Sequence, residues 1–391
     1  MIAVEDEWEN SGDPAVCGRR DRAAVRTVGS AVEGRALNAH ERKNANHRKG
    51  CAMKRVITTL ALAAALGFAA SAASAQTTLN NVKSRGMLNC GGNGSLAGFG
   101  LPDAAGNWTG LDVDFCRAIA AAIFDDAKKV KFVPLSAKDR FTALQSGEVD
   151  ILARNTTWTS SRDTSLGLNF TAVNYYDGQG FMVRQALKVN SGLELNDAAV
   201  CVQQGTTTEL NLADYFRANK MKLKTVTFAT ANEALKAYEA GRCDAYTTDA
   251  SGLYAERLRI ANPAEHIVLP DIISKEPLGP SVRHGDDQWL DIVKWVHYAM
   301  VTAEELGITS KTVDEALKSA NPDVKRFVGT EGNYGEQLGL TKDWAVRIVK
   351  HVGNYGEAFD RNVGAGSPLK IARGQNALWN KGGLQYAPPI R

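Results

Sequence analysis

The amino-acid sequence predicts an α/β protein with two lobes, and three observations support this prediction. Strand-like and helix-like segments alternate along much of the 391 residues, which favours parallel sheets joined by helical crossovers. The same order of strand, helix, strand, helix and strand occurs twice. From residue 281 onward the pattern is mainly helical, and we expect this segment to pack back on the first lobe. Ligands of such sheets bind beyond the carboxyl ends of the strands, so we expect a ligand cleft between the lobes.

The elements of the two units follow from apolar spacing and from glycines at helix ends. Gly147 and Gly241 each follow the second helix of their unit, where glycine can take the left-handed conformation. The first unit is expected to contain strands over 87–90, 130–134 and 149–153 and helices over 111–124 and 138–146. The second is expected to contain strands over 199–203, 223–228 and 243–247 and helices over 208–218 and 231–240. Further helices are expected over 289–303, 310–319 and 341–359.

Residues 53–75 have the pattern of a secretory signal peptide. Lys54 and Arg55 precede a short apolar segment, and the small residues Ala73, Ser74 and Ala75 form a cleavage site. We therefore expect cleavage after Ala75 and a mature chain outside the cytoplasm. Residues 1–52 precede this signal, and we interpret them as the product of a start codon assigned too early. The alternative is a disordered extension.

The mature chain is expected to cross between the lobes twice, near 182–184 and near 280–283. Lobe 1 would then hold residues 76–183 and 283–391, and lobe 2 would hold residues 184–282.

The charge balance argues against a nucleic-acid-binding protein. The chain has 46 Lys and Arg and 43 Asp and Glu, and the whole excess lies in residues 1–75. A protein held by phosphate contacts would carry a basic excess in its folded part. The histidines of the mature chain also lack metal-ligand spacing, so we expect no metal and no cofactor.

Four cysteines belong to the mature chain: Cys90, Cys116, Cys201 and Cys243. They allow three pairings, and the sequence by itself does not choose among them. If each sheet has its first strand in the middle, Cys201 and Cys243 lie on adjacent strands, and Cys90 lies beneath the helix that carries Cys116. One disulfide per lobe is therefore favoured, since it leaves the lobes able to move. Four buried free thiols are the alternative.

Two polar segments follow strands and could bind an anion. In the segment 150–163, Arg162 offers a two-pronged donor that matches a carboxylate, and Thr157 adds a hydroxyl. A solvated turn in which the arginine pairs with Asp163 explains these residues equally well. In the second unit, Thr206 and Thr207 precede a helix, whose first N–H groups can bind an anion. Simple helix capping is the alternative there.

Asp249 lies at the end of the strand predicted over 243–247. A carboxylate at this edge of the sheet could accept an ammonium group, although a lone aspartate would mean little. Opposite Arg162, Asp249 completes a receptor for a molecule that carries one charge of each sign. The sequence therefore predicts an α-amino acid as the ligand.

Long segments of the chain resemble substrate-binding proteins of polar amino-acid ABC transporters, and especially the general L-amino-acid-binding proteins. The resemblance extends from about residue 79 to residue 391. The segments that carry it are GLDVDFCRAIAAA (110–122), RFTALQSGEVDILARNTTWT (140–159), YYDGQGFMV (175–183), CVQQGTTTELNLADYFRANKMK (201–222), YEAGRCDAYTTDASGLYAERL (238–258), SKEPLGPSVRHGDDQW (274–289) and NALWNKGGLQYAPPIR (376–391).

The resemblance implies a two-lobed periplasmic-binding-protein fold of type II, also called a Venus flytrap, with a helical C-terminal extension on lobe 1. It places the ligand carboxylate on Arg162 and the ligand ammonium on Asp249. Leu96 stands where relatives specific for a basic amino acid have an aromatic ring, which fits a broad specificity. The implied ligand-binding residues are Arg162, Thr157, Asn155, Arg154, Thr206, Thr207, Asp249, Leu96, Phe99 and Arg140.

The function implied is that of a monomeric periplasmic receptor without catalytic activity. It would bind L-amino acids and deliver them to the membrane permease subunits of an ABC transporter. If Arg140 reaches the side-chain pocket, a narrow specificity for acidic or amide ligands is the alternative; Arg140 could equally be a surface charge. A periplasmic dehydratase on the same fold is a further alternative, but the sequence has no Ser/His/Asp or Cys/His set for it.

Overall fold

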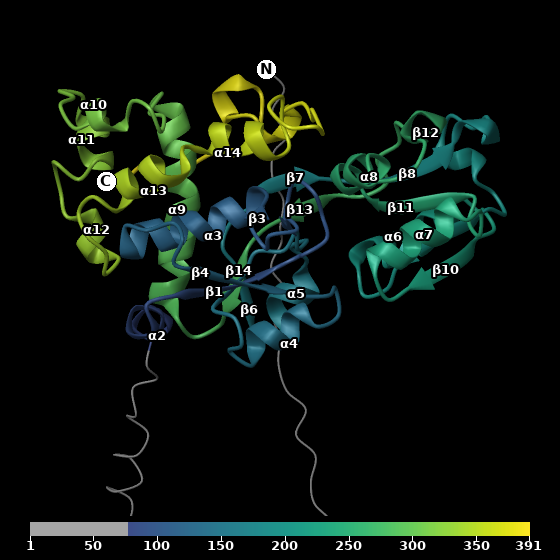
Figure 1. Cartoon of the computed structure of the whole chain (residues 1–391), viewed down its shortest axis with the longest axis horizontal. Coiled ribbons are helices and arrows are strands. Elements are labelled where there is room, and N and C mark those ends of the chain that lie inside the picture. Colours follow the sequence, from purple (N-terminus) through teal and green to yellow (C-terminus); the bar gives the residue numbers. More distant parts are fainter. Residues whose placement is uncertain (1–76) are drawn as a thin grey trace, which may run out of the picture. The chain divides into compact units, whose positions relative to one another are not determined.

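The computed structural model describes residues 77–391, which contain two five-stranded mixed sheets and two two-stranded ribbons (Figure 1). The predicted signal peptide at 53–75 and the segment 1–52 lie outside the described residues. Within residues 77–391, no helix is both long and apolar enough to cross a membrane.

The first sheet has the strand order β4-β1-β5-β14-β6. The strand β1 lies between β4 and β5 and runs parallel to both, whereas β14 runs antiparallel to β5 and β6. The predicted arrangement, with the first strand in the middle, is therefore confirmed. The strands are β1 (Leu88–Gly92), β4 (Val130–Pro134), β5 (Ile151–Leu152), β6 (Leu168–Phe170) and β14 (Ser281–Arg283).

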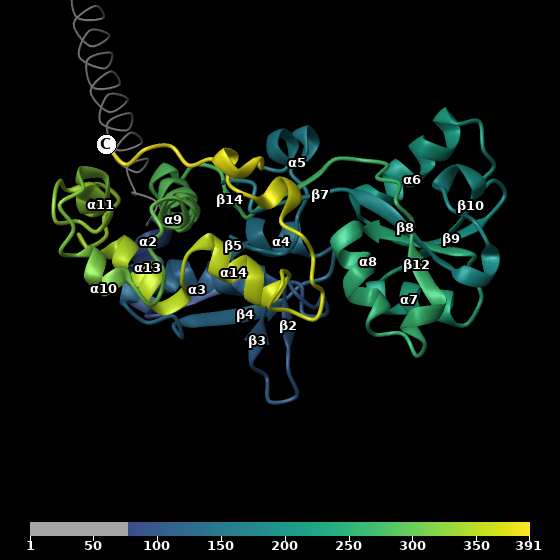
Figure 2. The ribbon, with the colours of Figure 1, turned by 90° about the horizontal axis from the view of Figure 1, so that it is seen from above.

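The helix α3 (Leu111–Phe124) packs on the first sheet, and eleven of its residues are buried. The C-terminal helices α9 (Asp287–Glu305) and α13 (Trp344–Val352) lie beside it in both views (Figure 1 and Figure 2). Their apolar side chains form one core with α3, and the indole N–H of Trp289 donates to the Asp150 carbonyl at 3.0 Å. The shorter helices on this sheet are α2 (Thr78–Arg85), α4 (Arg140–Gln145) and α5 (Ser160–Ser165).

The C-terminal segment differs in detail from the prediction. The single helix expected over 341–359 is two helices, α13 and α14 (Tyr355–Asn362), separated by Gly353 at φ 90°. Asn354 starts the second helix through a capping box with Glu357, which stops the first helix from continuing. The helix expected over 310–319 is only the short α10 (Val313–Ala316), and two unpredicted helices follow it, α11 (Pro322–Phe327) and α12 (Tyr334–Gln337).

The second sheet has the order β10-β9-β11-β8-β12, again with the first strand of the unit between the next two. Its two faces carry separate apolar clusters: Leu235 and Tyr238 of α7 belong to one, and Leu212 and Phe216 of α6 to the other. The elements are β8 (Gln179–Arg184), β9 (Ala199–Gln203), β10 (Lys224–Phe228), β11 (Ala245–Asp249), β12 (His266–Val268), α6 (Thr207–Ala218), α7 (Ala231–Glu239) and α8 (Ala250–Arg257).

A two-stranded ribbon of β7 (Tyr175–Asp177) and β13 (Glu276–Leu278) joins the two sheets, with Asp177 paired to Glu276. The strand β8 already belongs to the second sheet, so the chain enters that sheet at Gln179, a few residues before the crossing expected near 182–184. The return at β14 coincides with the crossing expected near 280–283. We propose this ribbon as the boundary between the two lobes.

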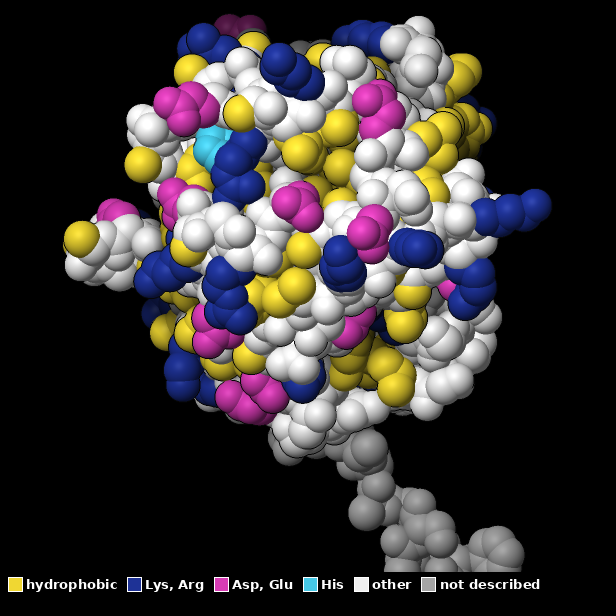
Figure 3. Space-filling model, turned by 90° about the vertical axis from the view of Figure 1, so that its right-hand side faces the viewer, with side chains coloured by type: hydrophobic (Ala, Val, Ile, Leu, Met, Phe, Trp, Pro, Cys, Tyr) yellow, Lys and Arg dark blue, Asp and Glu magenta, His cyan; other side chains and the backbone are white. Residues whose placement is uncertain are grey.

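Within residues 77–391 there are two disulfides, one in each unit. Cys90 of β1 is bonded to Cys116 of α3, and Cys201 of β9 is bonded to Cys243, two residues before β11. The favoured pairing is confirmed. One face of the molecule, shown in Figure 3, mixes Lys and Arg side chains with Asp and Glu and shows no large patch of one sign.

Candidate functional site

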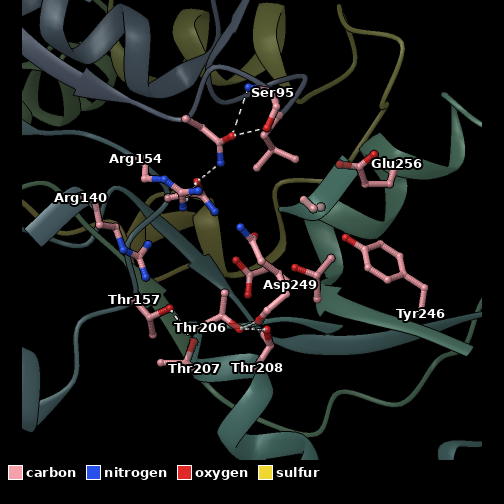
Figure 4. A pocket seen from close by; sticks show the side chains of 17 residues that line it. Ser95, Arg140, Arg154, Thr157, Thr206, Thr207, Thr208, Tyr246, Asp249 and Glu256 are labelled. Atoms are coloured by element: carbon pink, nitrogen blue, oxygen red, sulfur yellow. Dashed lines mark hydrogen bonds between the residues drawn. The ribbon is translucent and has the colours of Figure 1, made fainter. Parts of the chain in front are cut away.

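A cavity lies where strands of both sheets end. Seventeen residues line its roughly 540 Å³ of empty space, a volume that includes the open mouth (Figure 4). Asn93 follows β1 and Arg154 follows β5, while Gln203 ends β9 and Asp249 ends β11. Parallel strands of both sheets therefore bring polar side chains to one place, as their topology predicts.

All of the predicted ligand-binding residues except two line this cavity. The exceptions are Phe99, which is buried against Tyr175 with the ring centroids 5.1 Å apart, and Arg162. The predicted residues that line the cavity are Leu96, Arg140, Arg154, Asn155, Thr157, Thr206, Thr207 and Asp249.

Arg140 is buried in the wall of the cavity with few partners. Its side chain is hydrogen-bonded once, from Nη1 to the Thr156 hydroxyl at 3.3 Å, and its Nε has no partner within residues 77–391. Burial lowers the pKa of Arg140 well below its usual value, and the charges of Arg154 and Arg162 lower it further. An anion in the cavity would therefore stabilise the charged guanidinium. The alternative of a surface charge is wrong, because only 3% of Arg140 is exposed.

Arg154 forms the neighbouring part of this wall. Its Nε donates to the Leu135 carbonyl at 3.0 Å, which fixes the direction of the guanidinium. Burial lowers its pKa to about 10, so it is charged at neutral pH. Asn155, the next residue, has a positive φ of 35°, and its backbone N–H donates to the carboxylate of buried Asp112 at 2.7 Å. That bond holds the loop after β5 in place.

Arg162 is buried beside Thr157 and is not among the residues that line the cavity. Its Nη1 donates to the Thr157 carbonyl at 2.8 Å, and its guanidinium lies 5.2 Å from the centroid of the Phe141 ring. No ion pair joins it to Asp163 in the described part of the chain. Arg162 therefore holds the backbone of Thr157, and its role in binding a ligand stays a prediction.

Glu276 lies on the ribbon and was not identified from the sequence. Its carboxylate accepts hydrogen bonds from the hydroxyls that we predicted would bind the ligand. Thr157 and Thr207 both donate to its Oε2, at 2.6 and 2.8 Å, and Asn211 donates to its Oε1 at 2.7 Å. Glu276 is fully buried. Because Thr157 follows a strand of the first sheet and Thr207 starts a helix on the second, this carboxylate joins the two lobes.

The start of α6 forms one edge of the cavity. Thr206 is its N-cap, and its hydroxyl accepts from the Glu209 backbone N–H at 3.2 Å. The capping role is therefore confirmed. The anion-binding role of this helix start stays a prediction, compatible with the positions of Thr206 and Thr207 in the lining of the cavity.

Asp249 is a buried carboxylate without a hydrogen-bond donor or ion-pair partner among residues 77–391. It ends β11 and lines the cavity with 8% of its surface exposed. Burial raises its pKa well above the usual value, the nearby carboxylates of Asp177 and Glu276 raise it further, and Arg140 and Arg162 lower it. A cation in the cavity would therefore stabilise its ionised form.

Several residues that line the cavity were not predicted from the sequence. Asn93 donates to the Asn155 side chain at 2.8 Å and accepts from the Ser95 hydroxyl at 2.8 Å. The sequence could have identified Asn93, because it follows the strand-ending glycines of β1. It could also have identified Tyr246 and Thr248, because residues two apart on a strand point to the same side of the sheet. The unpredicted residues are Asn93, Ser95, Gln203, Thr208, Ala231, Tyr246, Thr248, Gly252 and Glu256.

Comparisons with known proteins agree with the fold. Residues 88–312 match the family of bacterial extracellular solute-binding proteins, family 3. The general L-amino acid-binding periplasmic protein AapJ of Rhizobium johnstonii is 63% identical over 342 residues, which cover 87% of this chain and all of the relative. The glutamate/glutamine/aspartate/asparagine-binding protein BztA of Rhodobacter capsulatus is 54% identical over 334 residues, covering 85% of this chain and 98% of the relative.

A solved structure extends the comparison to three dimensions. An ABC transporter periplasmic binding protein from Brucella ovis with glutathione bound superposes with a TM-score of 0.80 at 61% sequence identity. The match covers 81% of this chain and 99% of the other. The predicted resemblance and the predicted two-lobed type II fold are thereby confirmed, and the chain belongs to the bacterial extracellular solute-binding proteins, family 3.

Proposed function

We propose that this protein is an extracytoplasmic receptor that binds L-amino acids through their α-carboxylate and α-ammonium groups and delivers them to the permease of an ABC transporter. One observation carries the proposal: buried Asp249 and buried Arg140 face the same cavity, and neither has the partners that its charge requires. Burying unpaired charges is costly, and a zwitterion would satisfy both.

The carboxylate of the ligand would lie on the wall formed by Arg140 and Arg154, near Thr157 and the start of α6. Arg162 supports this site through the Thr157 carbonyl and adds a positive charge behind it. Direct binding of the carboxylate by Arg162 is the alternative that the sequence predicted. The ammonium of the ligand would lie on Asp249.

A broad specificity is favoured over a narrow one. Leu96 lines the cavity and offers no aromatic ring or charge that would select one side chain. The name of the Rhizobium relative describes general L-amino-acid binding, and that of the Rhodobacter relative describes binding of four acidic and amide amino acids. The narrow specificity stays as the alternative, with Arg140 as the group that would select acidic side chains.

Titration calorimetry of residues 76–391 with each of the twenty L-amino acids tests the proposal. We expect binding of many chemically different amino acids, and no binding of propionate or ethylamine, which each lack one of the two charged groups of alanine. D249N and R140M should each weaken alanine binding at least about tenfold, since a charge-assisted hydrogen bond contributes roughly 1.5–3 kcal/mol.

The matched control is D214N, on the exposed side of α6, where Asp214 pairs with Arg217. It should bind alanine like the wild type. Equal affinity of D249N, R140M and the wild type for alanine would overturn the site, and no binding of any amino acid would overturn the function.

The relatives compared are solute-binding proteins, and we propose that this chain likewise binds without catalysis, as a monomer and without a cofactor. Mass spectrometry of the ligand recovered after long incubation should return the amino acid unchanged. Conversion of the ligand would favour the dehydratase alternative. Light scattering should give the mass of one chain with and without ligand.

We also propose that the receptor works in the periplasm after cleavage of its signal peptide. The family is extracellular, and cleavage after Ala75 predicts a mature protein that begins at Gln76. Sequencing the N-terminus of the protein released from the periplasm tests this position.

A further inference from the structure

The end of the cavity opposite Arg140 and Arg154 carries an acidic residue that the proposed function does not use. Glu256 lies on α8 and lines the cavity, and 2% of its surface is exposed. Figure 4 shows the two arginines on one side of the cavity and the Glu256 carboxylate, pointing inward above Tyr246, on the other. The two charged ends of the cavity therefore differ in sign.

The helix α8 sets the distance between Glu256 and the proposed ammonium site. Asp249 is the N-cap of this helix, and Glu256 comes seven residues later. Seven residues make almost two full turns, so both residues lie on the same side of the helix, about 10 Å apart along its axis. A ligand held at Asp249 would need a long side chain to reach Glu256.

Only one oxygen of Glu256 is engaged. Its Oε2 accepts from Nη1 of Arg259 at 2.7 Å, and its Oε1 has no partner in residues 77–391. Arg259 also donates to the Asn232 side chain at 2.6 Å and to the Ser95 carbonyl at 3.4 Å. Arg259 is therefore shared among three acceptors, and its side chain is 37% exposed. The other oxygen of Glu256 is therefore available to a cation in the cavity.

We propose that Glu256 is a specificity-determining residue that binds the cationic end of long side chains, those of lysine and arginine, while their α-ammonium lies on Asp249. The inference rests on the proposed function, because it requires an amino acid in the cavity. Burial supports it further: burial raises the pKa of Glu256 to about 7 although Arg259 opposes the shift. A second cation beside the carboxylate would relieve that cost.

A different role for Glu256 would be to hold Arg259, whose bond to the Ser95 carbonyl joins α8 to the loop after β1. The two roles predict different results. Loss of a holding role weakens the binding of every ligand by the same factor. Loss of a side-chain site weakens only ligands with a distal positive charge, so the ratio of affinities separates the two.

The experiment is titration calorimetry of the wild type, E256Q and R259Q with lysine, norleucine and alanine. Norleucine has the carbon chain of lysine without the ammonium group. E256Q should lower the lysine-to-norleucine affinity ratio at least about tenfold and leave alanine binding within about twofold. R259Q removes the competing cation and should raise the same ratio, even if all three affinities fall together.

The outcomes distinguish failure of the role of Glu256 from failure of the proposed receptor function. If the wild type binds none of the three amino acids, the broad specificity and the role of Glu256 both fail, and the titrations with all twenty amino acids decide whether the receptor function fails with them. If it binds alanine but E256Q leaves the lysine-to-norleucine ratio unchanged, or if the wild type does not bind lysine, the role of Glu256 is overturned while the function stands. Alanine binding by each variant confirms that it is folded, and R259Q alone decides the matter if E256Q fails to bind alanine.

Discussion

The carboxylate of Asp249 and the guanidinium of Arg140 are both buried and both short of partners, and this determines how the site responds to pH. Burial and the carboxylates of Asp177 and Glu276 raise the pKa of Asp249, whereas Arg140 and Arg162 lower it, and burial dominates. A bound ammonium favours the ionised form, so the pKa of Asp249 is lower in the complex than in the free protein. Binding therefore releases a proton wherever the free carboxyl is protonated.

The affinity for alanine is accordingly expected to fall as the pH is lowered through the pKa of free Asp249. Asp177, whose pKa burial raises to about 6, interacts electrostatically with Asp249, and its protonation below that pH removes a second negative charge near the ammonium site. Calorimetry between pH 5 and pH 8, in buffers of different ionisation enthalpy, measures both the affinity and the protons released. D249N should bind weakly at every pH and release fewer protons. Equal proton release by D249N and the wild type would contradict the role of Asp249.

At the scale of single elements, glycines with positive φ and capping residues determine where helices begin and end. Gly353 separates α13 from α14 at φ 90° and ψ −178°, a region that only glycine adopts readily. A side chain added there would meet the Glu357 carboxylate at 2.8 Å, and this carboxylate also binds the Asn354 backbone N–H and the Ser310 hydroxyl. The break in the helix therefore depends on backbone freedom and on the capping box together.

G353A is expected to lower the free energy of unfolding by about 1–3 kcal/mol, the cost of placing a non-glycine residue in this region. Urea denaturation of the ligand-free protein measures it. The control is G147A, because Gly147 has φ 80° and nothing within 4 Å of an added Cβ, so its cost should be smaller. An unchanged midpoint for G353A would show that the helix break tolerates a side chain.

At the scale of the whole molecule, both disulfides lie within one unit each, and the ribbon of β7 and β13 joins the two sheets. The loops that they close span 26 and 42 residues in sequence. Each bond restricts the unfolded chain and is expected to stabilise the fold by roughly 3–4 kcal/mol. Neither sulfur pair belongs to the residues that line the cavity.

The variant C201S/C243S should therefore unfold at a lower denaturant concentration and still bind alanine with near wild-type affinity at 25 °C. C90S/C116S is the matched comparison in the other unit. Guanidinium denaturation and calorimetry give the two quantities. A loss of alanine affinity without a loss of stability would mean that the disulfide shapes the cavity directly.

Much of the site could be predicted because local sequence carries the relevant signals. Thr206, Thr207 and Asp249 sit where strands end or helices begin, and such positions follow from periodicity and capping. Arg162 and Phe99 were expected in the cavity and lie outside its lining. Which side of a loop a guanidinium occupies depends on neighbours distant in sequence, here Phe141, and no local pattern reports them.

The order of strands and helices in the two repeated units, and the place of each unit's first strand between the next two, could be predicted from the sequence, because alternating patterns and right-handed crossovers leave few arrangements. That order favoured one disulfide per unit, and the tertiary structure decided the pairing. Only the tertiary structure showed that Glu276 of the ribbon accepts hydrogen bonds from the Thr157 and Thr207 hydroxyls. Only the tertiary structure showed that Glu256 lines the cavity at the end opposite the two arginines. Both carboxylates reach the site only after two sheets, formed by separate parts of the chain, come together. Contacts of that kind depend on packing, and periodicity along the chain does not encode them.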